Sequence, residues 1–347
     1  MILGLMASGL LMAGPSDLAG KRVLTDMSGR GIEVPADISR IACIGRGSLR
    51  MVAYLHAADR VVGVEYPERK KTAHVRPYLA AYPRLKTLPS IGHGAAGDPE
   101  LLLKVAPQVI FYADGDLSAV ETLQAKTGIP IVHVHCGNLT NKRSDFNTCL
   151  LLMAYILNKQ SRCDSLIAFI DDELAEISRM DQELNLSQYT AYVGGLIFKG
   201  QHGITSTEAN YAPFQLLGMR NVATEIDRGI TLPVQISMEQ LLLWNPDVLV
   251  VDKACADRVA EEFNQYPLLK KMKAFQSKRI FEVLPSRLYG ENFETTLLNC
   301  HIIANCLGNT SFDFREKANE IYSMFLTADV ADAMLQVYGD SCIFSVD

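Results

Sequence analysis

Short apolar segments of strand length alternate along the chain with longer segments whose hydrophobic positions recur at helical spacing. The expected strands are residues 40–44, 60–65, 109–112, 131–135, 190–194, 248–251 and 280–283, and residues 88–94 are expected to form a strand that runs into a loop. Strands that alternate with helices in this way predict an α/β architecture, in which helices cover both faces of a parallel sheet. Residues 22–35 differ, because their alternating pattern around a Ser-Gly-Arg-Gly sequence predicts a β-hairpin.

The longest helical pattern covers residues 144–182 and contains neither proline nor glycine. Leu166 and Ile177 belong to a set of apolar residues at helical spacing, with acidic residues between them. Asn158 is the expected point at which the pattern divides into a short helix and a long one. Residues 161–180 alone would reach about 30 Å as a helix. That length suits either a core helix of one large domain or a connector between two domains.

An internal repeat favours the connector. Residues 99–112 and 238–251 match at five positions with a constant spacing of 139 residues, and Glu100 corresponds to Glu239. A helix–strand joint that recurs in any α/β fold is the alternative explanation. Two similar lobes on either side of one long helix explain the repeat, the chain length and the long helix together. The predicted fold is therefore α/β, with two Rossmann-like lobes that contain parallel sheets, one long α-helix that joins them, and a ligand cleft between the lobes.

The N-terminal residues 1–14 form an uncharged apolar segment, which is shorter than the about 20 residues that span a bilayer. They match the apolar part of a secretory signal peptide with cleavage after Ala13 or Ala19, although a basic start is missing. A buried N-terminal segment is the alternative. No cysteine lies near these positions, so a lipoprotein anchor is not expected. The predicted boundaries are 1–19 for the signal peptide, 20–142 for the N-terminal lobe, 143–183 for the linking helix and 184–347 for the C-terminal lobe.

Composition adds two constraints. The 347 residues are 48% hydrophobic and 21% charged, as in an ordinary globular protein, and the net charge of −6 argues against a nucleic-acid-binding surface. The eight cysteines show no CxxC pair and no metal-ligand spacing. In an exported protein they indicate either one or two disulfides or a reducing environment, and the sequence does not give the pairing.

Five segments, taken in order, resemble the helix-linked (class III) extracytoplasmic substrate-binding proteins of ABC importers. They are DMSGRGIEVPADISRI, AADRVVGVE, DPELLLKVAPQVIFY, ISMEQLLLWNPDVLVVD and KRIFEVLPSRLYGENFE. The family takes up ferric siderophores, haem, cobalamin and, in some members, molybdate or tungstate. The resemblance implies two lobes, a rigid linking helix and limited closure on the ligand. It also implies a periplasmic or otherwise extracytoplasmic monomer that carries no intrinsic cofactor and catalyses no reaction.

The same resemblance implies partners. An acidic residue of each lobe docks on the ABC permease, which works with its ATPase, and these positions correspond to Glu100 and Glu239. The alternative explanation is that each carboxylate stabilises the N-terminus of its own helix, and both explanations can hold.

Candidate ligand residues gather in a glycine-rich stretch, residues 192–211, and in loops that follow expected strands. The ligand-binding candidates are Arg46, His93, Lys199, Gln201, His202, Tyr211, Arg287 and Tyr289. Further candidates are Glu65, Tyr66, Asp114 and His135. Arginine suits bidentate binding of oxyanions, and His202 is the candidate metal ligand. Ser48 is expected to cap the helix that follows Arg46, and such a helix start favours anions.

These residue types predict an anionic metal-containing ligand. The first choice is an iron complex of the siderophore type or another anionic metal chelate, and the alternative is molybdate or tungstate. A metal-chelatase-like enzyme is the rival of another class, although P-loop, Gly-x-Ser-x-Gly and HExxH motifs are absent from the sequence. His133 and His135 suggest either a metal site or one face of a strand. An extracellular adhesin or sensor without a transporter is the third alternative.

Overall fold

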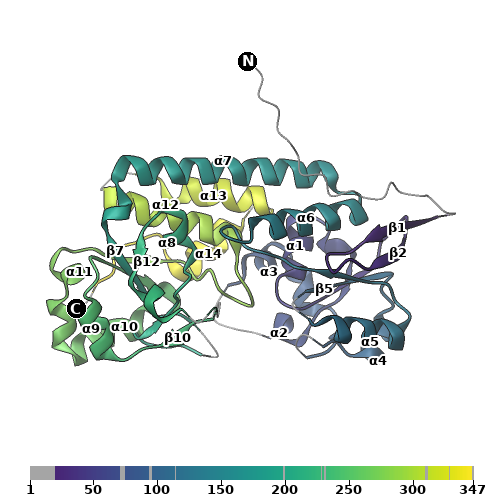
Figure 1. The fold of residues 1–347 in the computed structure, drawn as a ribbon, viewed down its shortest axis with the longest axis horizontal. Helices are drawn as coiled ribbons and strands as arrows, with labels where there is room; N and C mark the ends of the chain where they lie inside the picture. Colours follow the sequence, from purple (N-terminus) through teal and green to yellow (C-terminus); the bar gives the residue numbers. More distant parts are fainter. Residues whose placement is uncertain are drawn as a thin grey trace, which may run out of the picture. The chain divides into compact units, whose positions relative to one another are not determined.

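The computed structural model describes residues 20–70, 75–93, 96–113, 115–197, 200–227, 229, 232–308, 312–327 and 329–345. The predicted signal peptide lies outside these ranges. The chain forms two compact units (Figure 1). Unit 1 contains Met1–Lys70, Leu85–Cys136 and Thr148–Gln160. Unit 2 contains Lys71–Arg84, Gly137–Asn147 and Ser161–Asp347.

Unit 1 contains a parallel four-stranded sheet in the order β4-β3-β5-β6. Its strands are β3 (Ile41–Ile44), β4 (Val61–Gly63), β5 (Val109–Ala113) and β6 (Ile131–Val134). All residues of β3, β5 and β6 are buried, as expected for a sheet covered on both faces. The helices of this unit are α1 (Ser48–Tyr54), α2 (Tyr66–Arg69), α4 (Pro99–Val105) and α5 (Leu117–Thr127), with a 3-10 turn at Ala58–Arg60.

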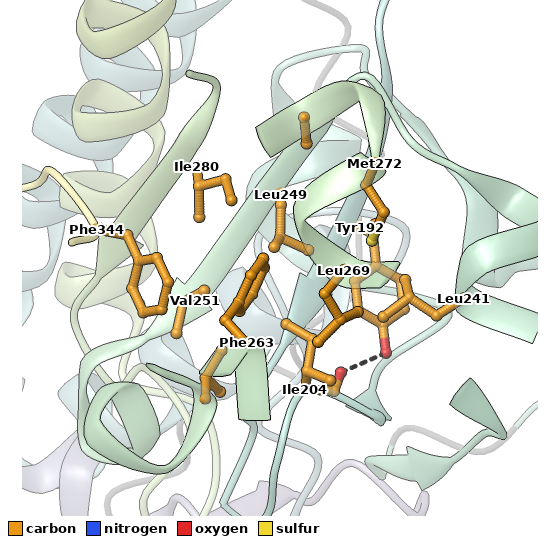
Figure 2. Close-up of a cluster of buried hydrophobic side chains, with 12 residues drawn as sticks. Tyr192, Ile204, Leu241, Leu249, Val251, Phe263, Leu269, Met272, Ile280 and Phe344 are labelled. Atoms are coloured by element: carbon orange, nitrogen blue, oxygen red, sulfur yellow. Dashed lines mark hydrogen bonds between the residues drawn. The ribbon is translucent and has the colours of Figure 1, made fainter. Parts of the chain in front are cut away.

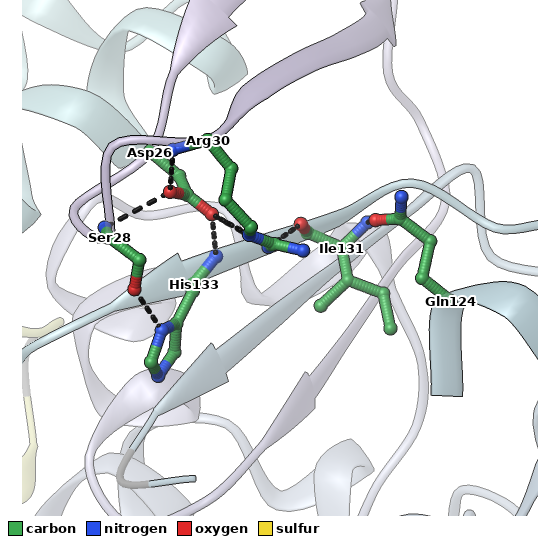
Figure 3. A network of polar contacts seen from close by, with 6 residues as sticks. All are labelled: Asp26, Ser28, Arg30, Gln124, Ile131 and His133. Atoms are coloured by element: carbon green, nitrogen blue, oxygen red, sulfur yellow. Dashed lines mark hydrogen bonds and ion pairs between the residues drawn. The ribbon is translucent and has the colours of Figure 1, made fainter. Parts of the chain in front are cut away.

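The predicted hairpin is confirmed as β1 (Lys21–Thr25) paired antiparallel with β2 (Gly31–Pro35). A polar network fastens it to β6 (Figure 3). The buried Asp26 carboxylate accepts hydrogen bonds from the His133 backbone N–H at 3.1 Å and from the Arg30 guanidinium at 2.7 and 2.9 Å. Arg30 also donates to the Ile131 carbonyl at 2.8 Å. Ser28 contacts the Nδ1 atom of His133. His133 therefore helps to hold the hairpin against β6.

Unit 2 contains a second parallel sheet in the order β12-β11-β7-β9. Its strands are β7 (Thr190–Gly194), β9 (Arg220–Asn221), β11 (Val248–Asp252) and β12 (Ile280–Val283). A two-stranded ladder pairs β8 (Ser206–Thr207) with β10 (Val234–Gln235). The helices of this unit are α3 (Pro77–Ala81), α8 (Ala212–Leu216), α9 (Met238–Trp244), α10 (Ala256–Gln265), α11 (Lys273–Gln276), α12 (Phe293–Gly308), α13 (Phe314–Phe325) and α14 (Val330–Tyr338). Its 3-10 turns are Leu186–Gln188, Val222–Ile226, Lys253–Cys255 and Pro267–Lys271, and a further turn at Pro83–Thr87 is shared with unit 1.

The hydrophobic core of unit 2 lies against one face of this sheet (Figure 2). The Phe263 ring packs 5.7 Å from the Phe344 ring, so the C-terminal segment belongs to the core. Tyr192 is fully buried, and its hydroxyl donates a hydrogen bond to the Ile204 carbonyl at 2.7 Å. The polar end of the tyrosine is thereby satisfied within apolar surroundings.

The long helical pattern forms two helices, α6 (Arg143–Leu157) and α7 (Gln160–Leu184). The predicted division at Asn158 is confirmed, because this residue has a left-handed φ of 57° and ends α6. Leu166 and Ile177 are buried as expected. No helix among the described residues is long and apolar enough to cross a bilayer.

The internal repeat is a pair of like helices. The Asp98 side chain caps α4 by accepting from the Glu100 N–H at 2.9 Å, and the Ser237 side chain caps α9 in the same way. Each helix is followed by a residue with a left-handed φ of 44°, which is Ala106 after α4 and Asn245 after α9. The strands β5 and β11 follow. The repeated helix–turn–strand unit is therefore confirmed.

Candidate functional site

In unit 1 the loop after β3 brings the backbone close to a buried carboxylate. Gly45 has a φ of 84°, and a Cβ atom there would lie 1.8 Å from the Ala113 carbonyl oxygen, so only glycine fits. The Gly45 N–H donates to Oε2 of the buried Glu65 at 3.1 Å. Arg46 is exposed at the tip of this turn. The contacts of Gly45 thus fix the backbone directly before the exposed Arg46.

The predicted helix cap at Ser48 is wrong. Its hydroxyl donates to the Ile44 carbonyl at 2.9 Å, and α1 begins without a side-chain cap. The hydroxyl is buried and turns back to the strand, because the glycine turn places the Ile44 carbonyl within its reach. With only seven residues, α1 offers little dipole for an anion.

Tyr66 and His93 lie together at the edge of the same sheet. Their rings stack with centroids 5.1 Å apart and an interplanar angle of 21°. The Tyr66 N–H donates to the Gly92 carbonyl at 2.9 Å, which fixes the two segments side by side. Both side chains are exposed, Tyr66 to 48%. This pair is accessible to a ligand.

His133 lies in β6 and His135 directly follows it, and the two side chains have different environments. Burial and the neighbouring His135 lower the pKa of His133, whereas His135 is exposed. Their ring centroids lie 4.9 Å apart. His133 is held by the hairpin, so of the two only His135 joins the exposed candidates. Asp114 lies outside the described residues.

In unit 2 the loop after β12 carries an arginine that contacts a buried carboxyl group. The Arg287 guanidinium lies 2.5 Å from the Glu208 carboxylate, and the carboxylate is fully buried while the Arg287 side chain is 23% exposed. Burial raises the pKa of Glu208 to about 8, against the opposing charge of Arg287. Nearby Glu291 raises it further. Arg287 is therefore a positioned cation with one accessible side.

The same loop contains an unusual backbone conformation. Tyr289 has a left-handed φ of 58°, which is uncommon for a residue with a side chain and typical of functional loops. The Arg76 guanidinium lies 5.5 Å from its ring centroid. The loop is closed by the Asn292 N–H, which donates to the Ser286 carbonyl at 2.7 Å. Arg287 and Tyr289 thus share one ordered loop.

The glycine-rich stretch is less accessible than the sequence suggests. Tyr211 is only 3% exposed, burial raises its pKa, and its ring packs edge-on to Phe214 at 4.9 Å. Gln201 is exposed, but its amide donates to the Ala254 carbonyl at 2.6 Å. His202 is half-buried. Lys199 lies outside the described residues.

Two residues that contact the loop of Arg287 and Tyr289 were not among the sequence candidates. Glu208 lies within the glycine-rich stretch, three residues before Tyr211, and an acidic residue in an otherwise basic and aromatic set is the signal that could have identified it. Arg76 lies in Lys71–Arg84, far from Tyr289 in sequence, and no local pattern relates the two.

A separate cluster in unit 2 could in principle bind a metal. Single ligand atoms of Glu173, Glu176 and His301 lie within 4.8 Å of one another. However, the Lys317 ammonium lies 2.7 Å from Glu173 and 3.1 Å from Glu176, and His301 bonds Glu173 at 2.7 Å. The Lys317 ammonium therefore already supplies the positive charge that a metal ion would bring to these carboxylates. This cluster therefore serves as an ion-pair network between α7, α12 and α13, and it does not include His202.

Glu100 and Glu239 are both exposed, in the first turns of α4 and α9. Hydrogen bonds from its own backbone N–H and from Ser237 lower the pKa of Glu239. Each glutamate keeps a carboxylate available to a partner. Their docking role stays a prediction.

Comparisons with known proteins agree on the family. The model of the periplasmic binding protein family matches residues 41–287. The molybdate-binding protein MolA of Haemophilus influenzae is 24% identical over 283 residues, which cover 75% of this chain and 76% of MolA. The structure of MolA bound to molybdate superposes with a TM-score of 0.66 at 21% identity, covering 88% of this chain and 97% of MolA.

Two other solved structures share the fold. A periplasmic solute-binding protein of Veillonella parvula has a TM-score of 0.72 at 18% identity and covers 92% of this chain and 96% of its own. The petrobactin-binding protein YclQ of Bacillus subtilis has a TM-score of 0.60 at 16% identity, with 83% and 98% covered. The predicted α/β fold with two parallel sheets and one long helix is confirmed.

Proposed function

Because the chain belongs to the periplasmic binding protein family, we propose that it captures a metal-containing anion for an ABC importer. Family members are the ligand-binding components of such transporters and are not enzymes. We further propose that this protein is exported as a monomer, carries no intrinsic cofactor and delivers its ligand to a permease and its ATPase.

The observation that supports an anion is the Arg287–Glu208 pair. An arginine whose carboxylate partner is buried cannot rotate freely, so it presents its guanidinium in one orientation. A planar guanidinium held in this way suits bidentate hydrogen bonds to an oxyanion. Burial raises the pKa of Glu208, which weakens the negative charge opposite Arg287 near neutral pH. The exposed Arg46 of unit 1 has the same chemistry.

Molybdate or a similar tetrahedral oxyanion is the ligand that the positioned Arg287 guanidinium fits best. The relative named a molybdate-binding protein supports this choice over the iron complex expected first from the sequence. An oxyanion needs hydrogen-bond donors, and guanidinium groups supply them without a metal ligand from the protein.

An anionic ferric chelate is the second candidate, and the Tyr66–His93 pair favours it. Stacked and exposed aromatic rings can pack on an organic chelator, and phenol and imidazole groups can also coordinate iron directly. The relative named a petrobactin-binding protein supports this candidate. His202 stays a candidate ligand for such a metal.

Thermal unfolding with a ligand panel tests the proposal. The panel contains molybdate, tungstate, sulfate, phosphate, ferric siderophores, haem, cobalamin and nickel. A specific ligand at 100 times its Kd should stabilise the protein by about 2.7 kcal/mol. If neither an oxyanion nor a ferric complex raises the melting temperature, the ligand class is wrong. Turnover of a substrate would instead support the metal-chelatase alternative.

A further inference from the structure

Two cysteines of unit 2 lie in direct contact. The Sγ atoms of Cys306 and Cys342 are 2.8 Å apart, although 36 residues separate them in sequence. Two non-bonded sulfur atoms at this distance are inside their van der Waals contact. Both side chains are partly exposed, whereas the other six cysteines of the chain are buried. This pair is therefore the one that combines proximity with access from solvent.

The backbone fixes the position of Cys342 independently of its side chain. The Cys342 carbonyl accepts a hydrogen bond from the Glu282 N–H of β12 at 2.9 Å. The next residue, Ile343, forms an antiparallel bridge with Phe281, and Phe344 enters the hydrophobic core. The C-terminal segment thus lies along β12 like an additional short strand.

Cys306 belongs to a helix that is attached to the end of the same strand. It lies near the end of α12 (Phe293–Gly308). Within α12, Asn299 donates to the Leu284 carbonyl at 2.8 Å and accepts from the Leu284 N–H at 3.0 Å, just after β12. Both cysteines are consequently held by elements that are attached to β12.

The environment distinguishes the two thiols. A hydrogen bond from Cys306 and the positive charge of Lys253 lower the pKa of the Cys342 thiol to about 7. The Lys253 ammonium is anchored nearby by the Tyr338 carbonyl at 2.7 Å. The bond to Cys342 and burial raise the pKa of Cys306. The positive charge of Lys253 favours a thiolate at Cys342, so we assign the first attack to Cys342 and the second to Cys306.

We propose that Cys306 and Cys342 form a disulfide that fastens the C-terminal segment to α12 in the exported protein. The oxidant is a disulfide, either a small molecule such as oxidised glutathione or a protein. The Cys342 thiolate attacks one sulfur of this disulfide and releases one thiolate. Cys306 then loses its proton and attacks Sγ of Cys342, which releases the second thiolate. The two cysteines give up two electrons, and the external disulfide is reduced to two thiols.

The location of this reaction in the cell rests on the proposed export, but its chemistry can be tested without a ligand. Reduced full-length protein is incubated with oxidised glutathione, denatured and titrated for free thiols. We expect six thiols instead of the eight cysteines of the sequence. Peptide mapping without reductant should identify a single cross-link between Cys306 and Cys342. Eight remaining thiols, or a cross-link between other cysteines, would overturn the proposal.

A stability measurement provides a second readout. The closed loop is long, so reduction of the oxidised protein should lower its melting temperature by roughly 5–10 °C. Cys306→Ser and Cys342→Ser should each remove this response to reductant, whereas Cys136→Ser, a control in unit 1, should keep it. Retention of the full response in either of the first two variants would contradict the proposal even if ligand binding is intact. Loss of ligand binding with an intact cross-link would contradict only the proposed function.

Discussion

The Arg287 guanidinium lies 2.5 Å from the carboxylate of Glu208, a residue that is fully buried in the same unit. This contact joins the loop after β12 to the glycine-rich stretch. It gives Arg287 a fixed orientation, and we propose that Arg287 in this orientation binds an anion that does not touch Glu208.

Arg287→Ala should weaken binding of the anionic ligand about 100-fold, because a charge-assisted hydrogen bond contributes roughly 1.5–3 kcal/mol. Isothermal titration with the ligand identified from the panel measures the loss. Arg258→Ala, at an exposed position of α10, is the matched control and should bind normally. Equal affinities of the Arg287→Ala variant and the wild type would exclude Arg287 from the site.

Glu208 should make the stability of unit 2 depend on pH. Its pKa is raised from about 4.5 to about 8 in the folded protein, mainly by burial. The unfolded state therefore loses this proton first, and stability falls as pH rises from about 4.5 to about 8, by about 5 kcal/mol in total. Urea unfolding at pH 5 and pH 8 measures the difference. Glu208→Gln cannot ionise and should reduce this slope, and an unchanged slope would show that another group is responsible.

Glu100→Gln and Glu239→Gln should separate binding from transport. Both carboxylates are exposed, so their removal leaves the fold and the ligand affinity unchanged. Uptake of the ligand by cells should nevertheless be lost, because the acidic residues are proposed to dock on the permease. Glu121→Gln, an exposed substitution on α5, serves as the control. Normal uptake with both glutamates replaced would contradict the docking role.

Asp26→Ala should destabilise unit 1 by about 3–5 kcal/mol, since it leaves Arg30 without its carboxylate and the His133 N–H without its acceptor. Asp37→Ala, an exposed neighbour, should cost much less. Chemical unfolding of the two variants gives the comparison. Similar midpoints for both would mean that the hairpin network contributes little.

The Glu173–Lys317 network should make unit 2 independent of metal ions. Chelator treatment should leave the melting temperature of the wild type unchanged, because the Lys317 ammonium supplies the positive charge. Lys317→Ala should lower the stability, and added zinc should stabilise this variant more than the wild type. A wild-type protein that loses stability on chelation would instead reveal a bound metal.

The sequence predicts the elements whose pattern is local. Strand-length apolar segments and the helices after Asp98 and Ser237 follow from residue spacing, although their side-chain caps were not predicted. Asn158 divides the long helix because asparagine tolerates a left-handed φ. The strand expected at residues 60–65 is shorter, Val61–Gly63, and continues as a single bridge from Val64 to Ser90. Here tertiary pairing, which the sequence pattern does not contain, decides where the strand ends.

The site residues depend more strongly on such distant contacts. Arg287, Tyr66 and His93 were candidates because each follows an expected strand, where ligands of α/β proteins bind. The stacking of the Tyr66 and His93 rings was not predicted, and the binding role of all three residues stays a prediction. Tyr211 is buried against Phe214, which its polar neighbours in sequence did not suggest. Glu208 and Cys342 gain their chemistry from partners 79 and 36 residues away, and a single sequence does not encode those distances.

The central claim is that a positioned arginine binds a metal-containing anion. Isothermal titration of the purified protein with molybdate, with sulfate as the matched oxyanion, tests it most directly. We predict saturable binding of one molybdate per chain, weak or no binding of sulfate, and loss of the molybdate signal in Arg287→Ala. Absence of binding by molybdate, tungstate and ferric chelates alike, or binding that Arg287→Ala leaves unchanged, would contradict the account.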